Sequence, residues 1–95
     1  MKSVVFSVNG TINFETALAF REKGDRWIDK QEDIIVDFQA VNHCNSAGLA
    51  LMTAWMRHAK RLGKPIRFIN VPSTLQVIAN VCGMVEILGM KKSHG

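Results

Sequence analysis

Short segments rich in β-branched residues alternate with longer segments of helical pattern along this chain. Ser3–Val8, Asp33–Phe38 and Ile66–Val71 are the predicted strands. The middle strand contains Ile34-Ile35-Val36 without polar alternation, which is typical of a strand covered on both faces. Strands separated by helical crossovers pair in parallel through right-handed connections. The sequence therefore predicts a small α/β sandwich, with a mixed but mostly parallel sheet and helices packed on it.

The segment between the first two strands is predicted to begin with a turn and to continue as a helix. Asn9-Gly10 is a strong turn dipeptide and is expected to end the first strand. Asn13 is expected to cap a helix that runs to about Ile28, although Gly24 weakens its second half. The apolar residues expected to contact the core are Phe14, Ala17, Leu18, Phe20, Trp27 and Ile28.

The other two helices also carry end signals. A long helix is expected from Asn45-Ser46-Ala47-Gly48 to about Leu62, closed by Gly63. Ser73-Thr74-Leu75-Gln76 predicts a capping box that opens a third helix ending at Gly83. Its expected buried residues are Leu75, Ile78, Ala79 and Cys82. Val85–Leu88 is a candidate terminal strand, and Lys91–Gly95 is a polar tail.

Composition excludes several classes of protein. With 95 residues, 47% apolar and 21% charged, the chain is expected to form a single domain over residues 1–95 rather than a disordered protein. No apolar run is long enough to span a bilayer, and the N-terminus does not resemble a signal peptide. Cys44 and Cys82 fit no metal or redox spacing and are expected to be small buried residues in a reducing compartment. We therefore expect a cytoplasmic protein.

Charge is divided unevenly along the chain. Residues 1–45 carry five Lys and Arg against seven Asp and Glu, whereas residues 46–95 carry seven against one. This asymmetry fits an acidic partner, a nucleic acid or a membrane surface, and it also fits a solvated helix face. A nucleic-acid interface would use Arg57, Lys60, Arg61, Lys64 and Arg67. We expect that nucleic acid is not a partner.

The long central helix has an unusually wide apolar side. Seven of the eight residues in Leu49–Met56 are apolar, and His58 falls on the polar side with Arg57 and Arg61. Two interpretations remain open: the core takes up the whole apolar surface, or an edge of it with Ala50 and Ala54 meets another protein. The apolar side consists of Leu49, Leu51, Met52, Trp55, Met56, Ala59 and Leu62.

The predicted loop His43–Gly48 precedes this helix and has two possible uses. Free backbone N–H groups at a helix N-terminus favour anions, whereas Asn45 or Ser46 could simply cap the helix. Catalysis would need Cys44 or Ser46 as nucleophile and His43 or His58 as base, but no acidic residue stands at a recognisable spacing to orient the base. The sequence has no P-loop, dinucleotide fingerprint or metal-ligand cluster. We expect no enzyme, no catalytic residue, no cofactor and no metal.

Together these segments resemble a STAS domain, the family of bacterial anti-sigma factor antagonists and of sulfate-transporter tails. The signature is a strand ending in Asp-hydrophobic, followed by Asp-Ser-Ser-Gly-Leu-Gly at a helix start, and here it reads Asp37-Phe38 and then Asn45-Ser46-Ala47-Gly48-Leu49-Ala50. Gly10, Lys64-Pro65-Ile66-Arg67-Phe68 and the capped third helix also match. In phospho-switched antagonists the second Ser accepts phosphate, and Ala47 stands at that place. The resemblance thus implies a STAS fold without the usual phospho-switch.

One branch of the family is closer, the MlaB-type STAS subunits of phospholipid-transport ABC systems. Their signature is similar to Asp-Thr-Gly-Gly-Leu-Ala-Leu, with a lone hydroxyl and two small residues, as in Asn45–Leu51 here. The resemblance implies a partner-binding adaptor of the transporter's cytosolic, MlaF-like ATPase subunit, which supports outer-membrane lipid asymmetry and meets the inner membrane only through its complex. The alternative is an antagonist that binds an anti-sigma factor without the phospho-switch. The implied partner-binding residues are Asn45, Ser46, Ala47, Gly48, Leu49 and Leu51.

Overall fold

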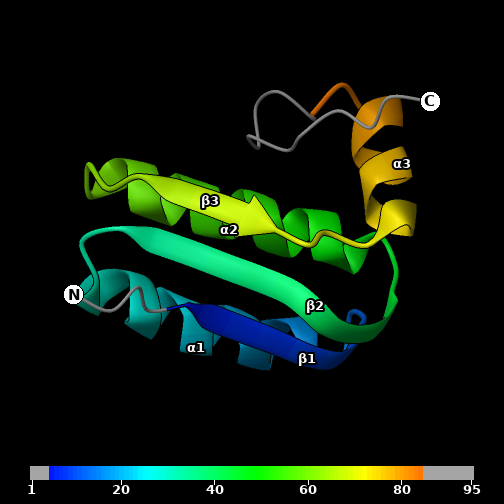
Figure 1. Cartoon of the computed structure of the whole chain (residues 1–95), viewed down its shortest axis with the longest axis horizontal. Helices are drawn as coiled ribbons and strands as arrows, with labels where there is room; N and C mark the ends of the chain where they lie inside the picture. The colour runs from blue at the N-terminus through cyan, green and yellow to red at the C-terminus, as the bar shows by residue number, and fades with distance from the viewer. Residues whose placement is uncertain (1–4, 85–95) are drawn as a thin grey trace.

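A computed structural model describes residues 5–84 of the chain. Its radius of gyration over Cα atoms is 12.5 Å. Strands and helices alternate along the whole described range (Figure 1). Their bounds are β1 (Phe6–Ile12), α1 (Ala17–Lys30), β2 (Ile34–Cys44), α2 (Ala47–Arg61), β3 (Ile66–Ile69) and α3 (Ser73–Val81).

The sheet confirms the predicted parallel α/β architecture. Its order is β1-β2-β3, and both neighbouring pairs are parallel, with Ile34 opposite Ile66 in the second pair. Because both right-handed crossovers advance one strand in the same direction, they leave α1 and α2 on the same face of the sheet (Figure 1). The candidate strand Val85–Leu88 and the tail Lys91–Gly95 lie outside the described residues.

The core lies between the sheet and these two helices. Alternate residues of β2 point towards the helices, so Ile34, Val36 and Phe38 are buried. Leu75 and Ala79 of α3 close one end of the core. The largest side chains with almost no exposure are Trp55, Phe38, Ile12, Ile28, Ile34, Met52, Leu75, Val8 and Val36.

Trp55 joins α2 to α1. Its indole N–H donates to the carbonyl of Arg21 at 3.3 Å, and its ring meets Phe6 edge-on at 5.7 Å between centroids. The indole lies directly against Gly24, where a Cβ atom would overlap it. Gly24 therefore does not interrupt α1, because the missing side chain provides the space that Trp55 fills.

The predicted first strand is displaced. β1 continues through Asn9-Gly10 to Ile12, so the expected turn there is wrong. The pairing with β2 shifts register between Ser7 and Asn9 and again between Gly10 and Thr11, and Gly10 has φ +85°. Glycine adopts this conformation without strain, so the dipeptide makes an irregularity within the strand instead of ending it.

The start of α1 also differs from the prediction. The side-chain oxygen of Asn13 accepts hydrogen bonds from the N–H groups of Glu15 and Thr16, which forms a separate turn before the helix begins at Ala17. Phe14 lies in that turn and is 72% exposed. Leu18 is 65% exposed, because the side of α1 that meets the core carries Phe20, Gly24, Trp27 and Ile28 instead. The predicted core contacts of Phe14 and Leu18 are wrong.

The end of α2 follows the prediction more closely. The helix stops at Arg61 with Leu62 as its cap, and Gly63 has φ +68°. The Lys64 ammonium donates to the carbonyls of Ile28 and Asp29 at 2.7 and 3.0 Å, which ties the end of α2 to the end of α1. Leu62, which was expected on the apolar side, is 46% exposed.

At α3 the predicted capping box is absent. Pro72 occupies the cap position, Ser73 is already in the helix, and the Gln76 amide donates to the carbonyl of Val71 at 2.8 Å. Gly83 follows the helix with φ +70°, as expected. Cys82 is exposed and Cys44 half-buried, so the prediction of two buried cysteines is wrong for Cys82. Within residues 5–84, no helix has the length and apolarity needed to cross a bilayer.

Candidate functional site

The connection between β2 and α2 is held by Asn45. Its backbone N–H donates to the carbonyl of Ile12 at 3.2 Å, and its side-chain oxygen accepts the N–H of Ala47 at 2.8 Å. The N–H of Gly48 donates to the Asn45 carbonyl at 2.9 Å. Asn45 therefore engages the first N–H groups of α2, which favours helix capping over anion binding at this end.

Ser46 occupies the cap position of α2 but does not act as a cap. Its side chain makes no capping hydrogen bond, and the residue is exposed. Its carbonyl accepts the N–H of Leu49 at 3.1 Å, so the backbone is engaged in the helix while the side chain is directed outward. Since Asn45 does the capping, the Ser46 hydroxyl remains available to a partner.

Gly48 lets the helix start approach its surroundings closely. A Cβ atom there would overlap the Sγ atom of Cys44 and would lie 3.1 Å from a methyl group of Leu75. Burial raises the pKa of the Cys44 thiol, with an opposing smaller effect from the Gly48 backbone. Cys44 is thus a packing residue that stays protonated at neutral pH, which makes it a poor nucleophile.

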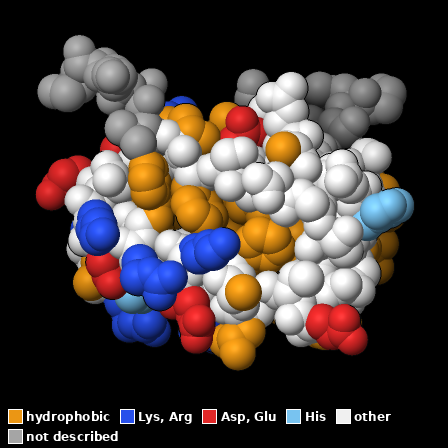
Figure 2. Space-filling view, turned by 90° about the horizontal axis from the view of Figure 1, so that it is seen from below, with side chains coloured by type: hydrophobic (Ala, Val, Ile, Leu, Met, Phe, Trp, Pro, Cys, Tyr) orange, Lys and Arg blue, Asp and Glu red, His pale blue; other side chains and the backbone are white. Residues whose placement is uncertain are grey.

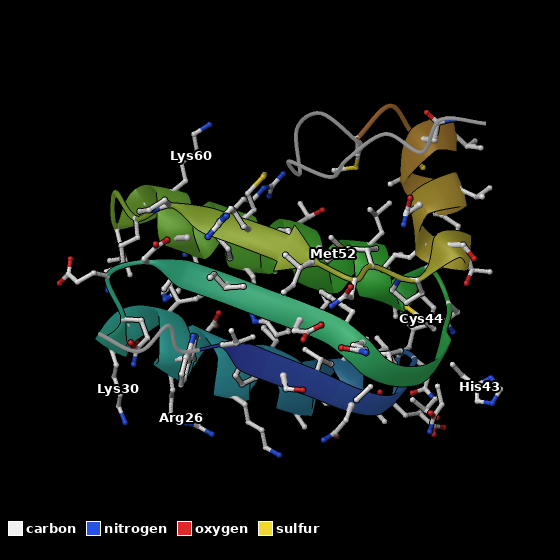
Figure 3. The ribbon with its side chains drawn as sticks, in the orientation of Figure 1. Arg26, Lys30, His43, Cys44, Met52 and Lys60 are labelled. Carbon is white, nitrogen blue, oxygen red and sulfur yellow. The ribbon has the colours of Figure 1, made fainter. Side chains whose placement is uncertain are left out.

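The histidines considered as catalytic bases lie elsewhere. The exposed ring of His43 projects from one end of the molecule, whereas Cys44 points towards α3 (Figure 3). The Nε2 atom of His58, on the polar side of α2, lies 2.7 Å from Asp29 Oδ1, so this residue is paired with a carboxylate of α1. In the described range, no three His, Cys, Asp or Glu side chains are grouped as metal ligands would be.

The six predicted partner-binding residues separate by burial. Asn45 and Ser46 are exposed. Ala47, Gly48 and Leu51 are buried beneath them, and Leu49 is 9% exposed at the edge of the core. Asn45 and Ser46 are therefore the two residues that a partner could contact directly, while the buried residues set the position of the helix start.

An open groove of about 600 Å³ begins at Ser46 and follows the outer side of α2. Ala50 and Ala54, which the sequence singled out as a possible contact edge, both lie in it. Arg21 of α1 and Met84 complete the lining, and we call this feature the α1–α2 groove. The α2 residues that line it are Leu49, Ala50, Thr53, Ala54, Arg57 and Arg61.

Sequence reasoning missed Arg21 and Thr53 as members of this surface. Arg21 reaches the groove because Trp55 fixes α1 against α2, a contact between residues 34 positions apart. Local periodicity carries no information on such a contact. Thr53 could have been found, since it follows Ala50 by three positions on the same helix.

The five cationic residues considered for nucleic acid do not form one surface. Lys64 is engaged with the end of α1, and Arg67 pairs in register with Ile35 on the sheet face away from the helices. Arg57 and Arg61 line the groove, while Lys60 points away from the molecule (Figure 3). Figure 2 shows that the exposed Lys and Arg seen from below also gather at one end, beside exposed hydrophobic side chains. Apart from Lys60, the candidate residues are therefore divided among the groove, the end of α1 and the outer face of the sheet, although the cationic side chains visible in Figure 2 lie together.

The comparisons with known proteins agree on the fold of this chain. A family model for the STAS domain matches residues 2–95. The unphosphorylated anti-sigma factor antagonist SpoIIAA is 16% identical with a TM-score of 0.66, over 90% of this chain and 88% of that chain. A sulfate transporter family protein from Wolinella succinogenes is 18% identical with a TM-score of 0.67, over 90% and 70%. At these identities the two structures show the fold alone.

A third structure is more similar in sequence. A chain of the Acinetobacter MlaFEDB complex in an ATP-bound conformation is 31% identical, with a TM-score of 0.78 over 90% of both chains. MlaB is the STAS subunit of that complex, and the present chain resembles it. No curated protein gives a significant match.

Proposed function

Because the chain belongs to the STAS domain family, we propose that it is a non-enzymatic adaptor that binds the cytosolic ATPase of a phospholipid-transport ABC transporter. The single observation that carries this proposal is the 31% identity, over 90% of both chains, to a chain of the MlaFEDB complex. In this proposal the protein is cytoplasmic and meets the inner membrane only through its complex.

The binding surface of the proposal is the Ser46 loop together with the α1–α2 groove. Ser46 is exposed and carries a small hydroxyl that leaves room for close approach. The groove continues from it along small side chains of α2. Asn45 and Ser46 contact the partner, and Ala47, Gly48, Leu49 and Leu51 hold the helix start in position from below.

The alternative is an antagonist that binds an anti-sigma factor without phospho-control. The fold likeness to SpoIIAA supports this alternative, whereas position 47 argues against a phospho-switch. Ala47 has no hydroxyl and is 1% exposed, so a kinase would find no acceptor there. Incubation with an anti-sigma kinase and ATP should leave the mass unchanged, and a stoichiometric gain of one phosphate on Ser46 would revive the switch.

The substitution Ser46→Arg tests the proposed surface. It puts a bulky charge into a packed contact, where an unpaired buried ion costs several kcal/mol, and should abolish capture of the ATPase subunit in a pull-down. Ser46→Ala removes one neutral hydrogen bond of about 1 kcal/mol and should weaken binding only several-fold. Circular dichroism of both variants should remain that of the wild type, because the side chain has no core contact.

Ser7→Arg is a matched control. Ser7 is exposed on β1 and lies next to the buried Val8, so its side chain points to the opposite face of the sheet from the helices. The Ser7→Arg variant should capture the ATPase subunit as the wild type does. If folded Ser46→Arg protein still co-purifies with the ATPase at wild-type yield, the Ser46 loop is not the interface.

A further inference from the structure

The α1–α2 groove changes character along its length. Near Ser46 it is lined by Ala50 and Ala54, above the nearly buried Leu49. At the other end it is lined by the exposed Arg57 and Arg61. One groove therefore offers a shallow apolar part with small side chains and, next to it, a cationic part.

The cationic part has two arginines that are not neutralised by a carboxylate within residues 5–84. On the opposite wall, the Nε atom of Arg21 lies 3.7 Å from Oδ2 of the Asp25 carboxylate. The guanidinium of Arg61 contacts Nδ1 of His58 at 3.5 Å and, within residues 5–84, no carboxylate. The Asp29 carboxylate binds the other nitrogen of that imidazole ring. Arg57 forms no ion pair in the described range. The groove therefore presents a net positive charge at Arg57 and Arg61.

The spacing of these charges suggests the shape of what they bind. Arg57 and Arg61 are four residues apart on α2, about 6 Å along the helix axis at 1.5 Å per residue. A second helix carrying carboxylates at the same separation would place one opposite each guanidinium, where Arg makes bidentate pairs. Small residues such as Ala50 and Ala54 let two helix backbones approach closely.

We propose that the segment of the partner that occupies the α1–α2 groove is an amphipathic α-helix with two carboxylates one turn apart. Its small or apolar residues lie on Ala50 and Ala54, and its carboxylates pair with Arg57 and Arg61. This inference rests on the proposed function, because it names the chemistry of the partner segment at the same surface.

A polyanion fits the surface less well than an acidic helix. Nucleic acids need a continuous row of cations along the phosphate backbone. Arg26 and Lys30 of α1 point away from the molecule in one direction and Lys60 of α2 in the opposite direction (Figure 3), and none of the three lines the groove. Two cations beside small apolar residues match a protein helix instead.

The test measures binding of the purified ATPase subunit to the full-length chain at low and at high salt concentration. The double substitution Arg57→Gln/Arg61→Gln should weaken binding about tenfold at low salt and flatten its salt dependence. Arg57→Lys/Arg61→Lys, which keeps the charge, should retain the salt dependence with a smaller loss of affinity. Lys60→Gln, on the same helix but outside the groove, should bind and respond to salt as the wild type does.

The outcomes separate this inference from the proposed function. If the double Gln variant binds as the wild type does while Ser46→Arg abolishes binding, the adaptor proposal stands and the acidic helix is wrong. If neither change affects binding, the Ser46 loop and the acidic helix are both wrong as the interface, and only a wild-type chain that fails to bind the ATPase subunit would overturn the adaptor proposal. Submicromolar binding of mixed-sequence DNA at physiological salt, lost in the double Gln variant, would overturn the acidic helix in favour of a nucleic acid. Urea denaturation of each variant should give the wild-type midpoint, since both arginines are exposed.

Discussion

The inner and outer sides of α2 differ in what they contact. The inner side carries Met52, Trp55 and Ala59, each with no exposed surface, and it supplies the centre of the core. The outer side carries Ala50, Ala54 and Arg57, which line an open groove and bury little. In the proposed function, the residues on the inner side of α2 therefore provide stability and those on its outer side provide recognition. Substitutions on the inner side should change the free energy of unfolding, and those on the outer side should change binding.

The largest expected effect is at Trp55. Trp55→Ala removes a fully buried indole and should lower the free energy of unfolding by about 4 kcal/mol. Urea denaturation measures this loss, and Trp55→Phe should lose less because most of the buried area is kept. Where Trp55→Phe is folded, its affinity for the ATPase should equal that of the wild type. A wild-type midpoint for Trp55→Ala would contradict the assignment of the inner side to the core.

Gly24→Ala tests the contact between α1 and the inner side of α2. Alanine is favoured over glycine in a helix by about 1 kcal/mol, so propensity alone predicts stabilisation. The added Cβ would overlap the Trp55 indole, and overpacking of this kind costs about 1–3 kcal/mol, so we expect net destabilisation. Gly63→Ala is the control: no atom beyond the neighbouring residues lies within 4 Å of its Cβ position, so only the strain of φ +68° opposes the substitution. Stabilisation by Gly24→Ala would show that Trp55 does not require this space.

The smallest effect is expected on the outer side, at Thr53. Its hydroxyl donates to the carbonyl of Leu49 at 2.8 Å, a bond within the helix that contributes little to stability. Thr53→Ala should therefore change the free energy of unfolding by no more than about 0.5 kcal/mol in thermal or urea denaturation. A loss comparable to that of Trp55→Ala would mean that the outer side also belongs to the core.

The sequence predicts the layered arrangement because periodicity and chain order determine it. Three β-branched segments separated by helical crossovers have few alternatives to a parallel sheet, and the inner side of α2 follows from the spacing of Leu51, Met52, Trp55 and Ala59. The sequence likewise predicts the end of α2 at Gly63, because the positive φ that commonly follows a helix favours glycine.

Features that depend on contacts between residues far apart in the chain could not be predicted from the sequence. Asn9-Gly10 is a turn dipeptide in isolation, but in the fold its pairing with β2 keeps it in a strand. Phe14 is exposed because the helix begins three residues later than the Asn13 signal indicates, and Leu18 is exposed because it lies on the side of α1 away from the core. The groove needs Arg21 from α1 beside Arg57 from α2, a proximity that depends on the packing of the two helices, including the contact of Trp55 with Arg21.

The most direct test of the division between the two sides of α2 is chemical-shift mapping by NMR. The isotope-labelled full-length chain is titrated with the purified ATPase subunit, and backbone amide shifts are followed residue by residue. We predict that the affected amides gather at Ser46, Ala50, Ala54 and Arg57, along the α1–α2 groove. Shifts that gather instead on the opposite face of the sheet, at Ser7, Ile35 and Arg67, would contradict the assignment of recognition to the outer side of α2.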